Sequence, residues 1–105
     1  MKQVRANWRT TILVCRKCSK KIGGGFGPKG RTSLVKALRR EARLAKGRKA
    51  AAGIVEVPCL KVCPRYAVTV VDGAHPDAWL VVEAGTPIDG VAARLGLVAD
   101  VDPVA

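Results

Sequence analysis

Apolar residues along this chain form four short runs and two stretches with helical spacing. The runs are rich in β-branched residues and predict buried strands at residues 11–15, 54–57, 67–71 and 79–82. Leu34, Ala37, Leu38, Ala42 and Ala45 recur every three or four residues and predict a helix over 33–46, with Thr32 or Ser33 as its N-cap and Gly47 as its end. A second helix is expected to begin after Thr86, with Pro87 at its first position, and to end at Gly96.

The predicted order is strand, helix, strand, strand, strand, helix, which indicates an α/β or α+β sandwich. The first two strands should be parallel and joined by a right-handed crossover through the 33–46 helix. Asp72-Gly73 and the segment 74–77 form the turn of a β-hairpin between the last two strands. We expect a flexible basic N-terminal segment at 1–10, one domain at 11–97 and a flexible tail at 98–105.

The cysteines lie in two pairs, each following a predicted strand. Cys15 and Cys18 follow the first strand, and Cys59 and Cys63 follow the second. Because the carboxyl ends of parallel strands meet at one edge of a sheet, this topology should bring all four thiols together. Four such thiols indicate a metal or iron–sulfur site, two disulfides, or one redox pair with two bystanders.

Part of the sequence resembles a known family, the thioredoxin-like 2Fe–2S ferredoxins related to the small cluster-bearing subunit of respiratory complex I. The similarity covers roughly residues 11–97. The segments that carry it are Ile12-Leu13-Val14-Cys15, Val57-Pro58-Cys59-Leu60-Lys61-Val62-Cys63-Pro64, Ala67-Val68-Thr69-Val70-Val71-Asp72-Gly73, Trp79-Leu80-Val81-Val82 and Gly85-Thr86-Pro87. The resemblance implies a thioredoxin-like βαβ unit followed by a β-hairpin and a C-terminal helix. It also implies that Cys15, Cys18, Cys59 and Cys63 ligate one 2Fe–2S cluster.

The chemistry of these residues suits an electron carrier. Four thiolates supply two ligands to each iron of a 2Fe–2S cluster, and nearby positive charge stabilises the anionic cluster and raises its reduction potential. The cations in or beside the two cysteine loops, expected to serve the cluster or to dock a partner, are Arg16, Lys17, Lys20, Lys21 and Lys61. The same lysines and arginines also suit a solvated basic surface. In the family the first two cysteines are usually further apart than here, and a C-x-x-C pair with a C-x-x-x-C pair also suits tetrahedral zinc.

Two further patterns offer alternatives. A C-x-x-C pair after a strand also suits a thioredoxin-type dithiol, which needs a helix beginning at the first cysteine. We expect the glycines at 23–25 to prevent a helix so soon after Cys18, and a dithiol leaves Cys59 and Cys63 without a role. The stretch from Gly25 to Thr32 is a near match to a phosphate-binding loop, with Arg31 where lysine is required and Pro28 lacking an N–H group.

The charge is concentrated in the first two thirds of the chain. Residues 1–65 hold 18 of the 19 Lys and Arg residues and two acidic residues, a net charge of +16, whereas residues 66–105 carry −5. This field should attract acidic partners. We expect an acidic redox protein such as a flavoprotein reductase, with a homodimer as a further candidate. Nucleic acid is the alternative partner, contacted by the basic stripe from Lys36 to Lys49. The alternative function is a structural zinc protein with four cysteine ligands that binds nucleic acid or an acidic protein.

The remaining sequence signals are negative. No apolar run is long enough to cross a membrane, and the N-terminus lacks a secretory apolar region, so a cytoplasmic protein with reduced thiols is expected. No nucleophile–base pair or carboxylate pair stands out, so no enzyme is predicted. His75 falls in the hairpin turn, away from both cysteine loops, and is expected to have no role in the site.

Overall fold

The computed structural model describes residues 1–97, and the predicted tail at 98–105 lies outside the described residues. The strands are β1 (Thr11–Cys15), β2 (Gly53–Val57), β3 (Ala67–Asp72) and β4 (Leu80–Glu83). The helices are α1 (Arg16–Lys21), α2 (Leu34–Glu41) and α3 (Ile88–Arg94), with a 3-10 turn, η1, at Gly47–Lys49. The chain is therefore a mixed α/β protein, as the apolar pattern predicts.

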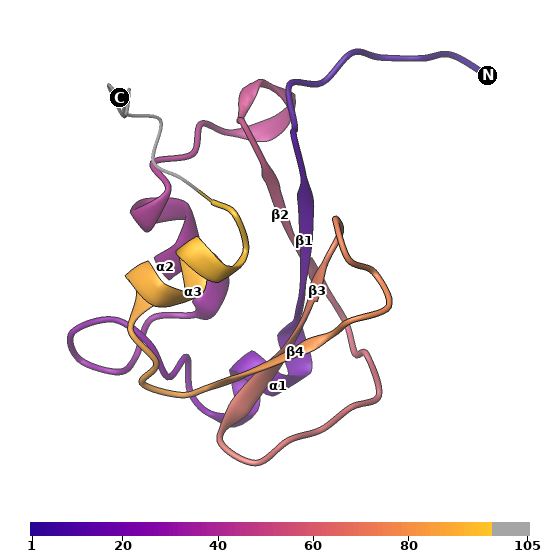
Figure 1. The fold of residues 1–105 in the computed structure, drawn as a ribbon. Coiled ribbons are helices and arrows are strands. Elements are labelled where there is room, and N and C mark those ends of the chain that lie inside the picture. The colour runs from indigo at the N-terminus through magenta and orange to yellow at the C-terminus, as the bar shows by residue number, and fades with distance from the viewer. Residues whose placement is uncertain (98–105) are drawn as a thin grey trace.

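The four strands form one mixed sheet in the order β2-β1-β3-β4. β1 and β2 are parallel, with Thr11 opposite Gly53 and Cys15 opposite Val57. β3 runs antiparallel to both β1 and β4. Figure 1 shows α2 and α3 together on one side of the sheet, with α1 at the end where β1 finishes. The parallel pairing of β1 and β2, with α2 in the connection between them, confirms that part of the predicted topology.

The core lies between the sheet and the helices. Phe26 is its largest fully buried side chain and packs with Ile12, Val14, Leu34 and Leu38. β3 is buried along its whole length, because β1 and β4 flank it and helices cover one of its faces. The first cysteine pair follows β1, next to this buried strand, and the second pair lies on the loop that joins the edge strand β2 to β3.

The prediction that no helix follows Cys15 is wrong. α1 begins at Arg16 with Cys15 as its N-cap and includes Cys18. The glycines end this helix instead of preventing it. Gly23 has a φ of 61°, its N–H bonds to the Lys20 carbonyl at 3.1 Å, and the Gly24 N–H bonds to the Ser19 carbonyl at 3.0 Å. This pair of bonds is the Schellman arrangement, which favours glycine just after a helix.

The helix predicted over 33–46 is shorter than its apolar pattern. Ser33 is the N-cap and accepts a hydrogen bond from the Lys36 N–H at 3.3 Å, as predicted, but α2 ends at Glu41. Arg43 takes a φ of 51°, and the Leu44 N–H bonds to the Arg39 carbonyl at 3.1 Å. An arginine thus takes the left-handed position that normally favours glycine, and Gly47 begins η1 instead of ending the helix.

The last helix departs from prediction at its start and agrees at its end. Pro87 is the N-cap, and not the first helical residue; no side chain caps the helix, and the Thr86 hydroxyl donates to the Glu83 carbonyl at 2.6 Å. Gly96, with a φ of 72°, ends the helix as predicted. None of the helices within residues 1–97 has the length and apolar character needed to cross a membrane.

Candidate metal or redox centre

The two cysteine loops meet at the carboxyl ends of β1 and β2. Cys15 is the last residue of β1, and β2 ends opposite it at Val57. The Lys17 N–H donates to the Pro58 carbonyl at 3.3 Å, and the Cys18 thiol donates to the Val62 carbonyl at 3.7 Å. The parallel strands therefore bring the two loops into direct contact, as the topology predicts.

The four thiols differ in exposure. Cys15 and Cys18 are buried, Cys59 is half-buried and Cys63 is exposed, and all four are free. The Cys59 sulfur accepts a hydrogen bond from the Lys61 N–H at 3.3 Å, within its own loop. Lys61 reaches this position with a φ of 63°. The first pair is thus fixed in the core, while the second pair lies on the loop between β2 and β3.

Cys15 is the member of the buried pair whose pKa is lowered. Burial raises its pKa, but hydrogen bonds from the N–H groups of Cys18 and Leu60, from the Cys18 thiol and from the Lys17 N–H outweigh burial and leave the pKa below its ordinary value. The Leu60 N–H comes from the second cysteine loop, so that loop already donates to the first cysteine. Thiolate sulfur is the form that binds metals and attacks disulfides.

Cys18 has the opposite tendency. Burial raises its pKa, and so does the neighbouring Cys15 sulfur, while the backbone and hydroxyl of Thr69 lower it in part. Because the pKa values of these two adjacent thiols are displaced in opposite directions, the favoured state of the pair is a Cys15 thiolate beside a protonated Cys18.

The four sulfur atoms do not form a ligand cluster in this arrangement. Within residues 1–97, no three Cys, His, Asp or Glu side chains lie close enough together to hold a metal ion. The donor set itself fits an iron–sulfur cluster or zinc, since it consists of four thiols, two at the junction of β1 and α1 and two on the adjoining loop between β2 and β3. Binding either one requires Cys59 and Cys63 to turn toward the buried pair, on a loop that has no helix or strand between Val57 and Ala67.

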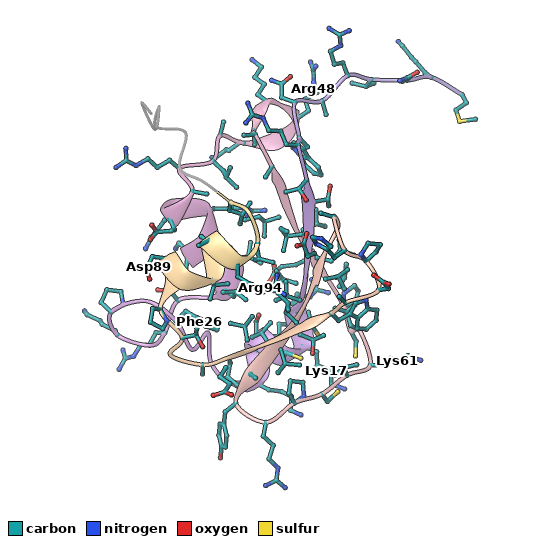
Figure 2. The ribbon with its side chains drawn as sticks, in the orientation of Figure 1. Lys17, Phe26, Arg48, Lys61, Asp89 and Arg94 are labelled. Carbon is teal, nitrogen blue, oxygen red and sulfur yellow. The ribbon has the colours of Figure 1, made fainter. Side chains whose placement is uncertain are left out.

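The predicted cations surround this end of the sheet. Arg16, Lys17, Lys20 and Lys21 are exposed on α1, and Lys61 is exposed on the second loop. Figure 2 shows Lys17 and Lys61 at the same end of the sheet, beside sulfur atoms drawn in yellow. Their charge makes the electrostatic potential at this end of the sheet positive, which favours the addition of an electron and attracts acidic partners.

Other sequence signals lie elsewhere. His75 contacts Asp72 at 3.3 Å, at the end of β3 opposite the start of β1, and is remote from the cysteines as predicted. The near match to a phosphate-binding loop uses its N–H groups internally: Gly25 donates to Gly30, and Phe26 and Thr32 donate to each other. Those groups are therefore not free to bind phosphate.

Sequence analysis did not identify Thr69 as part of the site. Thr69 is fully buried in β3, and its hydroxyl donates to the Val62 carbonyl at 3.0 Å. The same carbonyl accepts from Cys18, so one acceptor joins the helix, the second cysteine loop and the central strand. A single hydroxyl in a strand otherwise made of Ala, Val and Asp was the available signal.

Replacing Thr69 with valine should loosen the second cysteine loop. Valine keeps the shape but removes one hydrogen bond, so the free energy of unfolding should fall by about 1 kcal/mol. Trypsin should cleave after Lys61 and Arg65 faster than in the parent protein, because opening of the loop exposes these bonds.

Thr86→Val is the matched control for this loop. It removes a comparable hydroxyl–carbonyl bond, to Glu83, away from the cysteine loops. Equal tryptic cleavage after Lys61 and Arg65 in the two variants would show that Thr69 does not hold the loop.

Comparisons with known protein families, with curated proteins and with solved structures found no significant match to this chain.

Proposed function

We propose that this protein is a one-electron carrier of the 2Fe–2S ferredoxin type, with the cluster held by Cys15, Cys18, Cys59 and Cys63. The observation that supports the proposal is the contact between the two cysteine loops through Lys17, Pro58, Cys18 and Val62. All the thiols of the protein lie on these two loops. When bound, the cluster would supply reversible one-electron chemistry, and the chain supplies the four thiolates.

The surroundings of the thiols also suit an anionic cofactor. N–H groups of Lys17, Cys18 and Leu60 point toward the Cys15 sulfur, and such donors stabilise added negative charge. The exposed cations of α1 and Lys61 provide a docking surface for an acidic redox protein, such as a flavoprotein reductase.

The test is anaerobic purification followed by metal and sulfide analysis. We expect two irons and two acid-labile sulfides per chain, and visible absorption that dithionite bleaches. A colourless protein with one zinc per chain would replace the proposal with a structural zinc site made of the same four cysteines. Purification from cells grown with added iron, beside a culture with added zinc, separates true preference from metal supply.

A second candidate is thiol–disulfide exchange by Cys15 and Cys18, and the observation that favours it is the helix that begins directly after Cys15. The Cys15 thiolate would attack a partner disulfide and release one partner thiolate. Cys18 would then displace the second partner thiolate, leaving a Cys15–Cys18 disulfide and a reduced partner. This chemistry needs neither Cys59 nor Cys63, which distinguishes it from the cluster proposal.

A further inference from the structure

A basic groove lies between α2 and the edge strand β2. Its volume is about 800 Å³. The side chains that define it, here named the basic groove, are Trp8, Lys36, Arg39, Arg40, Arg43 and Lys46. Glu56 is the one acidic residue among those that line it. The groove thus presents hydrogen-bond donors and positive charge, which suits a ligand made of acceptors.

The cations of the groove have no acidic partners in the described part of the chain. There, the single ion pair joins His75 and Asp72, on another part of the sheet. Lys36 and Arg40 are four residues apart on α2, and like charges at this spacing repel each other and oppose helix formation. An anionic ligand would remove that repulsion.

Trp8 forms a fixed wall of the groove. Its indole N–H donates to the Gly47 carbonyl at 2.8 Å, and its ring packs so closely on Gly53 that a Cβ there would lie 2.2 Å from ring atoms. The side chain is still 38% exposed. An aromatic ring held by the backbone and open to solvent on one side is a surface on which a base can stack.

Arg39 closes the edge of the sheet beside the groove. Its guanidinium donates to the Ile54 carbonyl at 2.7 Å, on the outer edge of β2. This contact occupies an acceptor that another strand would otherwise use, so the groove is poorly suited to adding a β-strand from a partner.

The N-terminal segment extends the positive surface. The Asn7 N–H donates to the Arg48 carbonyl and the Arg9 N–H to the Ala51 carbonyl, each at 2.7 Å. These bonds hold residues 7–9 beside η1, where further exposed cations lie. Figure 2 places Arg48 at the opposite end of the sheet from Lys17 and Lys61. The groove and its extension are therefore separate from the cations around the cysteines.

We propose that the basic groove binds single-stranded nucleic acid. Lys36, Arg40, Arg43 and Lys46 contact the phosphates, and a base stacks on the exposed part of Trp8. The concave shape and the aromatic wall favour a single strand over a duplex, because duplex binders insert a projecting element into a groove of the DNA. Leu44, Ile54 and Val55 also line the groove, so an acidic protein is the competing occupant, and the comparison with poly-aspartate below tests it.

The test is fluorescence anisotropy of the full-length protein with a labelled mixed-sequence DNA of about 12 nucleotides, within the usual single-strand site sizes. Binding should weaken as salt rises. In Lys36→Ala/Arg40→Ala, affinity at low salt should fall at least about tenfold. The negative slope of log K against log salt should become shallower by about 1.4, which is about 0.7 for each lost phosphate contact. Alanine favours helix, so α2 should stay folded.

The matched control is Lys20→Ala/Lys21→Ala, which removes the same charge from α1. The affinity of this variant for the DNA should change by less than about twofold, because the lost charges act only through the long-range field of the protein. In a Trp79→Phe background Trp8 is the single tryptophan, and DNA should quench its fluorescence. Equal losses in both double variants, no binding at low salt, or tighter binding of poly-aspartate than of DNA would each overturn the proposal. None of these measurements depends on a bound cluster.

Discussion

Replacing Cys63 with serine is expected to remove the visible absorption of the anaerobically purified protein and most of its bound iron. The cluster proposal needs four thiolates, and a serine hydroxyl has too high a pKa to replace one of them effectively at neutral pH. Cys63 is the exposed member of the set, so its replacement should leave the fold and its free energy of unfolding nearly unchanged. Loss of iron would then report on ligation and not on folding.

The control for this variant is Val62→Ser. Val62 is 42% exposed on the same loop, and its hydrogen bonds from Cys18 and Thr69 go to its backbone carbonyl, which serine keeps. This substitution adds a serine to the loop without removing a thiol, and the iron content should stay at the parent level. Iron, sulfide and absorption are measured on both variants after identical anaerobic purification.

Two results would contradict the four-cysteine cluster. Full retention of iron in Cys63→Ser would show that Cys63 is not a ligand and would contradict the four-cysteine proposal. The second result is a parent protein that contains no iron and reduces the disulfides of insulin. If Cys15→Ser loses this activity and Cys63→Ser keeps it, the dithiol candidate is established in place of the cluster. Cys15 and Cys18 are needed for both the cluster and the dithiol, so variants of Cys59 and Cys63 distinguish the two functions.

The position of the cysteine loops followed from the sequence because it depends on strand order. Two apolar runs separated by a helix predict a parallel pair, and a parallel pair places Cys15 and the end of β2 at one edge. The final positions of the sulfur atoms did not follow. Cys59 and Cys63 lie on a loop whose path is set by Thr69 and Val62, a contact between β3 and the loop that no local pattern encodes.

Helix ends were predictable only where glycine marks them. Gly96 ends α3 as expected, but Arg43 ends α2 in the conformation that glycine usually takes. At α1 the glycines mark the end of a helix that the sequence does not predict, because Gly23 and Gly24 are unfavourable inside a helix and yet complete its C-terminal hydrogen bonds. The position of Trp8 as a wall of the basic groove could not be predicted either, because Trp8 packs on Gly53, which is 45 residues away in the sequence.

Gly24→Ala is expected to destabilise the protein by about 3 to 5 kcal/mol, a large part of the roughly 5–15 kcal/mol that stabilises a domain. Gly24 has a φ of 95°, which an L side chain rarely adopts, and a Cβ there would lie 2.3 Å from the Arg31 carbonyl oxygen. The obstacle is backbone, so no side chain can turn away to make room. The strand-like contact between Phe26 and Thr32 would have to shift with it.

This substitution also acts on the candidate site. The Gly24 N–H bonds to the Ser19 carbonyl at the end of α1, and the Ser19 hydroxyl donates to the Cys15 carbonyl at 3.3 Å. Displacing Gly24 should therefore fray α1 and loosen Cys18, so the variant should retain less iron than the parent even under conditions where it is mostly folded.

Gly23→Ala provides the comparison. Gly23 also has a positive φ, 61°, but a Cβ there would meet nothing within 4 Å. Its cost should be only the left-handed strain, about 1–2 kcal/mol, reduced by the lower entropy of the unfolded alanine chain. Urea unfolding followed by far-ultraviolet circular dichroism gives both free energies. Equal losses in the two variants would mean that φ alone sets the cost, and that the close approach of Gly24 to Arg31 does not constrain the end of α1.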